Sequence, residues 1–150
     1  MQEPNCVGIL PSYPGIEIEI IPGELVVALE VSEDYYPVLD SIGTAVRKGI
    51  IHTGIVELDS LNIKNRLLSF KTELFHFEIT ETNLIRYKRD LKISTLLVIF
   101  VFPKETDLLE LAKLYCQFPY IKFVEPNFII PFSLIKNSSW GIIKRREYTP

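Results

Sequence analysis

The sequence has few of the residues from which metal sites and catalytic centres are built. Its 150 residues include two cysteines, two histidines and one methionine. Cys6 and Cys116 are too few for a disulfide framework or a zinc site, and Cys116 is expected to act as a small buried hydrophobic residue. His52 and His76 have no neighbouring Ser or Cys motif that needs a base, so we expect both on the surface or in loops. The sequence therefore predicts a protein that is not an enzyme and has no metal or cofactor.

The chain also lacks the charge and the apolar length that bind nucleic acids and membranes. It has 16 Lys and Arg against 19 Asp and Glu, a net charge of −3, so no positive field attracts a polyanion. The longest apolar run, 96–103, is far shorter than the roughly 20 residues of a membrane-spanning helix. Residues 1–15 lack the basic start and apolar core of a secretory signal. A cytoplasmic protein is expected, unless the chain is a processed product of a secreted one.

What remains is the composition of one globular domain, with 47% hydrophobic and 23% charged residues. Its first predicted strand covers residues 16–21, in which isoleucine and glutamate alternate as in a half-exposed strand. Pro22-Gly23 is typical of a turn, and it is expected to separate this strand from a second, apolar one over 24–31.

A helix is expected next, over 33–48, with Ser32 as its N-cap. Residues 55–61 are predicted to form another strand. The segment 67–79 is aromatic enough for a strand, but its alternation is broken. Residues 80–92 are polar and mixed in charge, so they form either a short helix or a loop.

The second half of the domain repeats the strand–helix–strand order. The continuous apolar run 96–102 predicts a central strand buried on both faces, and an apolar stripe over 108–116 predicts a helix. A last strand is expected over 121–132. Because proline cannot donate to a sheet ladder, Pro126 and Pro131 indicate that this strand lies at an edge of the sheet or is interrupted there.

This order predicts an α+β fold, a ferredoxin-like split βαβ sandwich with an antiparallel sheet and two helices on one of its faces. The domain boundaries expected are an N-terminal arm over 1–15, the ferredoxin-like domain over 16–132 and an extended C-terminal tail over 133–150. The second face of the sheet is expected to be open and apolar, which usually marks a partner surface.

Three motifs, in order along the chain, resemble the propeptides of subtilisin-like serine proteases. Ile-Pro-Gly-Glu-Leu-Val-Val at 21–27 resembles their opening strand, and the segment 108–129, with Val-Glu-Pro-Asn at 124–127, resembles their last helix and strand. Ser-Trp-Gly-Ile at 139–142 is similar to the start of many mature subtilases. The middle of the chain, 58–92, is longer than in that family, and none of the catalytic motifs of the protease is present.

The resemblance implies a domain that inhibits a subtilisin-like serine protease, encoded in the same chain or separately, and that chaperones its folding. In that family the open sheet face packs on two helices of the protease, and the segment after the last strand enters the active-site cleft. Glu125 is the candidate for charge attraction to helix N-termini of the partner. The protease-binding residues that the resemblance implies are Phe123, Glu125, Asn127, Phe132, Ser133, Leu134, Ile135 and Lys136.

Several alternatives stay open at this point. Phe123, Glu125 and Asn127 can be ordinary positions of an edge strand, and 133–150 a linker. The basic run 144–146 is either a processing site, a partner contact or solvated charge. The chain can be the first part of a complete subtilase. It can also be a ferredoxin-like domain that binds a small ligand or RNA, although the strand containing Phe100 carries no Lys or Arg beside its aromatic residues.

Overall fold

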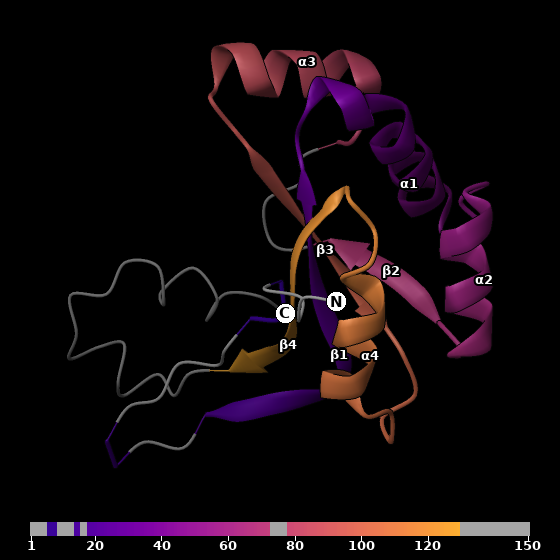
Figure 1. The fold of residues 1–150 in the computed structure, drawn as a ribbon, viewed down its shortest axis with the longest axis vertical. Helices are drawn as coiled ribbons and strands as arrows, with labels where there is room; N and C mark the ends of the chain where they lie inside the picture. The colour runs from indigo at the N-terminus through magenta and orange to yellow at the C-terminus, as the bar shows by residue number, and fades with distance from the viewer. Residues whose placement is uncertain (1–5, 9–13, 16–17, 73–77, 130–150) are drawn as a thin grey trace.

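The computed structural model describes residues 6–8, 14–15, 18–72 and 78–129. This part of the chain forms one antiparallel sheet with the strand order β2-β3-β1-β4 (Figure 1). That order, with β1 and β3 in the centre, is the split βαβ arrangement, and the prediction of an α+β ferredoxin-like sandwich is confirmed. The strands are β1 (Glu19–Glu30), β2 (Ser69–Thr72), β3 (Thr95–Val101) and β4 (Ile121–Ile129). The helices are the 3-10 turn η1 (Glu33–Tyr35), α1 (Tyr36–Lys48), α2 (Val56–Lys64), α3 (Glu81–Asp90) and α4 (Leu108–Tyr115).

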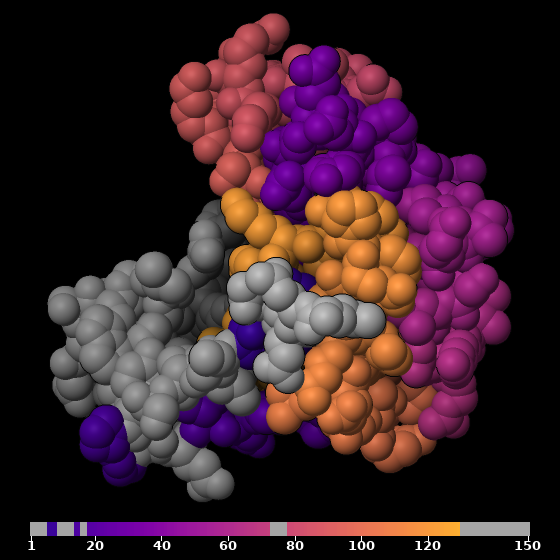
Figure 2. All heavy atoms as spheres, in the orientation of Figure 1, coloured from indigo at the N-terminus to yellow at the C-terminus, as the bar shows by residue number. Residues whose placement is uncertain are grey.

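The helices cover one face of the sheet. Leu25, Val27 and Leu29 of β1 point toward them and share one buried cluster with Leu39 of α1 and Tyr115 of α4. Figure 2 shows α4 near the middle of the visible surface, with α1 above it and α2 beside it. The short helix α3 contacts α1 and lies at one end of the molecule (Figure 1). Burial of this apolar face drives the fold.

The predicted strand over 55–61 is wrong, because this segment forms helix α2. The apolar residues of this segment do not all face the core. Val56 and Ile63 of α2 are 72% and 70% exposed, whereas Leu58 is buried, so their spacing does not indicate a helix. The sheet is completed by β2, at the start of the weakly patterned segment 67–79. The segment 80–92 forms α3 rather than a loop. The described chain therefore has four α-helices instead of the expected two.

The turn predicted at Pro22-Gly23 is also wrong, because β1 runs through both residues. The pairing of β1 with β4 shifts between Ile20 and Leu25, so the extra residues form an irregularity within one strand. Gly23 has a φ of +79°, and a Cβ there would collide with the carbonyl oxygen of Phe102. The backbone N–H of Phe102 donates to the Gly23 carbonyl at 2.7 Å. Glycine is thus required at position 23 by the bulge and by the close approach of the Phe102 backbone. A Pro-Gly dipeptide is as typical of such a bulge as it is of a turn.

The other boundaries follow the expected signals. The central strand β3 is flanked on both sides, and β4 with Pro126 is an edge strand, as predicted. Asp107 is the N-cap of α4, and its side chain accepts from the backbone N–H of Glu110 at 3.2 Å. Ser32 is the N-cap residue of η1, as predicted, but its side chain makes no capping hydrogen bond.

Candidate partner-binding site

The face of the sheet opposite the helices brings together the described members of the predicted protease-binding set. Val26 pairs with Ile99 on one side and with Glu125 on the other, so these three side chains share this face. Phe123 and Asn127 lie two residues on either side of Glu125 along β4 and share its orientation. Phe132, Ser133, Leu134, Ile135 and Lys136 lie outside the described residues.

The centre of this face is not open as expected. Val26, Ala28 and Ile99 are fully buried, although they point away from the helices and do not belong to the helix-side cluster. Apolar side chains on both faces of the sheet are therefore removed from water, as the hydrophobic effect favours. Phe123 and Glu125, on the edge strand, are half-buried. They are the two described members of the predicted set that solvent reaches.

A polar network crosses one end of this face and includes Asn127. The carboxylate of Glu24 on β1 accepts from Lys71 Nζ of β2 at 2.8 Å and from Asn127 Nδ2 of β4 at 3.0 Å. Asn127 is only 2% exposed, and its Oδ1 accepts from the backbone N–H of Phe128 at 3.0 Å. The amide of Asn127 therefore joins strands and supports the position of the half-buried Glu125 on the same face.

The outer edge of β4 is occupied by the described part of the N-terminal arm, residues 6–8. Val7 forms a parallel bridge with Val124. The backbone N–H of Gly8 donates to the Val124 carbonyl at 2.7 Å, and the Val124 N–H donates to the Cys6 carbonyl at 2.7 Å. Further along the same edge, Pro126 has no N–H to offer. This edge is thus protected against uncontrolled strand pairing.

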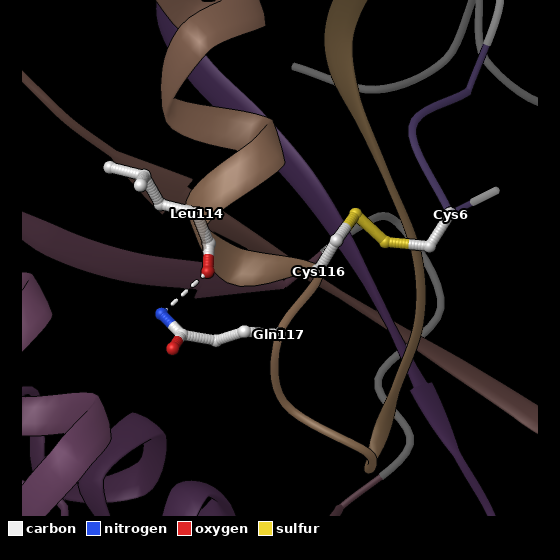
Figure 3. Close-up of a disulfide and its surroundings, with 4 residues drawn as sticks. All are labelled: Cys6, Leu114, Cys116 and Gln117. Carbon is white, nitrogen blue, oxygen red and sulfur yellow. Dashed lines mark hydrogen bonds between the residues drawn. A yellow bond between two sulfur atoms is a disulfide. The ribbon is translucent and has the colours of Figure 1, made fainter. Parts of the chain in front are cut away.

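A disulfide between Cys6 and Cys116 holds the arm in this place, which corrects the expectation of an unpaired, buried Cys116. Figure 3 shows Cys116 at the end of α4, beside Gln117, whose side-chain amide donates to the Leu114 carbonyl at 2.8 Å. The two Cα atoms are 5.8 Å apart, a separation that fits a disulfide. The cysteines are 110 positions apart in the sequence, so their pairing depends on the tertiary fold.

A second polar cluster surrounds Asp59 of α2. Its Oδ1 accepts from the N–H and the hydroxyl of Thr53 at 2.9 and 2.6 Å, and its Oδ2 accepts from the Gly54 N–H at 2.9 Å. Burial alone would raise the pKa of Asp59, but these hydrogen bonds outweigh it, and the pKa is lowered from 3.8. His52 Nδ1 lies 3.1 Å from Oδ2 and its side chain is 78% exposed, so His52 is a surface residue as predicted. His76 lies outside the described residues.

This cluster closes the loop before α2. The Thr53 hydroxyl donates to Asp59 and accepts from the N–H of Ile55 at 3.1 Å, so both of its roles serve the loop. Within the described ranges, no group of three His, Cys, Asp or Glu side chains could hold a metal ion.

Phe100 of β3 and Phe102, which follows the strand, are packed inside the helix-side core. Phe100 is fully buried and meets Tyr115 edge-on, with ring centroids 5.4 Å apart. Phe102 is also buried and contacts the same ring. The Tyr115 hydroxyl donates to Asn62 of α2, and burial raises the pKa of Tyr115 above its ordinary value. These rings are therefore not available as a stacking platform for bases, the arrangement that single-stranded RNA requires of such a sheet.

Comparison with protein-family models, with curated proteins and with solved structures finds no match to this chain. Among the helices of the described residues, none has the length and apolar character needed to cross a membrane.

Proposed function

We propose that this chain is a propeptide-like domain that binds and inhibits a subtilisin-like serine protease and assists the folding of that protease. The observation that carries the proposal is the position of the Val-Glu-Pro-Asn segment at 124–127. It lies on the edge strand β4 of a split βαβ sheet, and the chain continues from there into the tail. The resemblance of this segment to the last strand of subtilase propeptides implies the same placement.

The helix-free side of the sheet is the side from which a protease approaches in this proposal. The helices occupy the other face, and Phe123 and Glu125 lie on the helix-free one with part of their surface in contact with solvent. Phe123 contributes apolar area, and the Glu125 carboxylate meets helix N-termini of the protease, where N–H groups and the helix dipole favour an anion.

The tail over 133–150 supplies the second contact. It enters the cleft as an extended strand, whose main chain forms hydrogen bonds with the cleft edges while alternate side chains fill pockets. The protected edge of β4 is consistent with these two separate contacts. Residues 6–8 already pair with both backbone groups of Val124, so the strand that pairs with the cleft edges of the protease is supplied by the tail and not by β4.

The disulfide bears on the compartment in which the domain works. Disulfides persist in secreted and periplasmic proteins and are rare in the cytosol. Of the two locations expected from the sequence, Cys6–Cys116 favours a processed product outside the cytoplasm over a cytoplasmic protein. We include this location in the proposal.

The test is an inhibition assay with a subtilisin-like protease from the same source. We expect the chain to slow hydrolysis of a chromogenic peptide in proportion to its concentration and to raise the yield of refolded protease. Glu125→Gln is expected to weaken inhibition, whereas Glu105→Gln, in an exposed ion pair with Arg66, serves as the control and leaves it unchanged. If the chain neither inhibits the protease nor changes its refolding yield, the proposal is overturned. Tight RNA association in a low-salt filter-binding assay would favour the alternative class.

A further inference from the structure

We propose that the Cys6–Cys116 disulfide is a redox latch, and that its reduction by a dithiol releases residues 6–8 from the outer edge of β4 and uncovers the backbone of Val124. This device concerns the domain itself and does not depend on the identity of its partner. It joins two observations: the disulfide, and the strand-like pairing of the segment that contains one of its cysteines.

The described part of the arm lies on β4 through backbone hydrogen bonds and through the packing of Cys6 and Val7, which are partly buried against the core. Two backbone hydrogen bonds join it to Val124, one from the Gly8 N–H and one to the Cys6 carbonyl. The net contribution of each such bond is small, because water replaces it when the arm leaves. The covalent bond to Cys116 removes the entropy that a free arm would regain. The disulfide is therefore the covalent constraint on an edge that is otherwise held by these hydrogen bonds and by the packing of Cys6 and Val7.

The latch is accessible to a reductant. Cys6 and Cys116 are both half-buried rather than enclosed in the core, so the disulfide lies near the surface, where a small dithiol can approach it. A thiolate of the dithiol attacks one sulfur to form a mixed disulfide, and its second thiol resolves it. The chain gains two electrons and two protons as two cysteine thiols, and the dithiol becomes an intramolecular disulfide.

Opening the latch changes a small, defined part of the surface. The Val124 N–H and carbonyl lose their partners in the arm, while Pro126 still offers no donor and the Phe128 N–H keeps its bond to Asn127 Oδ1. Gly8 also leaves the side of Glu125, against which it packs so closely that a Cβ would lie 2.7 Å from Glu125 Oε2. The reduced domain thus presents one open backbone position, that of Val124, beside Glu125.

Hydrogen exchange of individual backbone amides tests the proposal on the full chain. In the oxidised protein the Val124 amide is expected to be protected, and a dithiol should raise its exchange rate by roughly tenfold or more, as in local opening. The amides of Val27 and Val98, paired between the central strands β1 and β3, should lose protection only by the amount that the global loss of stability explains, and they should exchange more slowly than Val124 in the reduced protein. An unchanged Val124 rate would overturn the latch. A Val124 amide that exchanges no faster than Val27 and Val98 after reduction would also overturn it, because the disulfide would then stabilise the fold only globally.

Two variants separate the disulfide from the arm contact. Cys6→Ser should reproduce the reduced exchange pattern and no longer respond to the dithiol. Gly8→Val keeps both cysteines but has no room beside Glu125, so it should expose Val124 in the oxidised protein as well. Gly49→Ala, where an added Cβ meets open space, is the control and should leave Val124 protected. Protection of Val124 in both Cys6→Ser and Gly8→Val would contradict the proposal.

Discussion

Asn127 of β4 and Glu24 of β1 are 103 positions apart in the sequence and are joined by a hydrogen bond of 3.0 Å from Asn127 Nδ2 to Glu24 Oε1. The other carboxylate oxygen accepts from Lys71 Nζ of β2 at 2.8 Å. One carboxylate thus connects the two edge strands through a central strand, on the face where we place the partner contact.

Removal of this carboxylate is expected to destabilise the sheet. Glu24→Ala leaves the buried amide of Asn127 without this acceptor, which costs about 1–3 kcal/mol in free energy of unfolding. Urea unfolding measures the loss. Glu105→Ala, which breaks the exposed Arg66–Glu105 pair, should change stability little. Equal effects of the two substitutions would show that the network contributes no more than a surface ion pair.

The Asp59 cluster predicts a defined pH dependence. Because hydrogen bonds from Thr53 and Gly54 hold the pKa of Asp59 below 3.8 in the folded state, its contribution to stability is complete above the unfolded pKa of about 3.9. That contribution is lost as the pH falls through the lower folded pKa. Asp59→Asn should therefore cost about 1–3 kcal/mol at pH 7, and the difference from the wild type should shrink at acid pH. A difference that stays constant with pH in urea unfolding would contradict this assignment.

Gly23 tests the bulge in β1. Gly23→Ala meets both a positive φ and the carbonyl oxygen of Phe102, so it should cost more than the roughly 1 kcal/mol of a left-handed alanine alone. Gly49→Ala has a φ of +67° with nothing within 4 Å of the added Cβ, which supplies the matched control. Thermal or urea unfolding compares them, and equal losses would argue against the close approach.

The disulfide is expected to contribute to global stability as well as to the local latch. It closes a loop over a sequence separation of 110 residues, for which the chain-entropy description gives about 4–5 kcal/mol as an upper bound. Cys6→Ser should lower the free energy of unfolding by about 2–5 kcal/mol. Urea unfolding with and without a dithiol checks this value, because reduction should affect the wild type and leave the variant unchanged.

The elements that the sequence predicted correctly are those whose pattern is decided locally. The apolar run of β3, the stripe of α4 and the proline in β4 each indicate one structure whatever surrounds them. The middle of the chain failed for a physical reason. In α2, Val56 and Ile63 lie on the exposed surface, and Asp59 stabilises the loop before the helix by contacts that no periodicity reveals.

The candidate site was only partly predictable. Its position on β4 followed from the motif at 124–127, whereas the burial of Asn127 and its bond to Glu24 depend on strands that are distant in sequence. The pairing of Cys6 with Cys116 and the arm on Val124 likewise require the folded sheet. The signal that could have pointed to the disulfide was the presence of two cysteines, but a sequence alone does not pair them.

The inhibition constant of the full chain, compared with that of a chain ending at residue 132, tests the central claim most directly. Both are measured against the same subtilisin-like protease, with urea unfolding as the check that each is folded. We predict that the full chain inhibits and that loss of 133–150 weakens inhibition by roughly tenfold or more, equivalent to about 1.4 kcal/mol, with little change in stability. Equal inhibition by the two folded chains would contradict the role of the tail, and no inhibition by either would contradict the account as a whole.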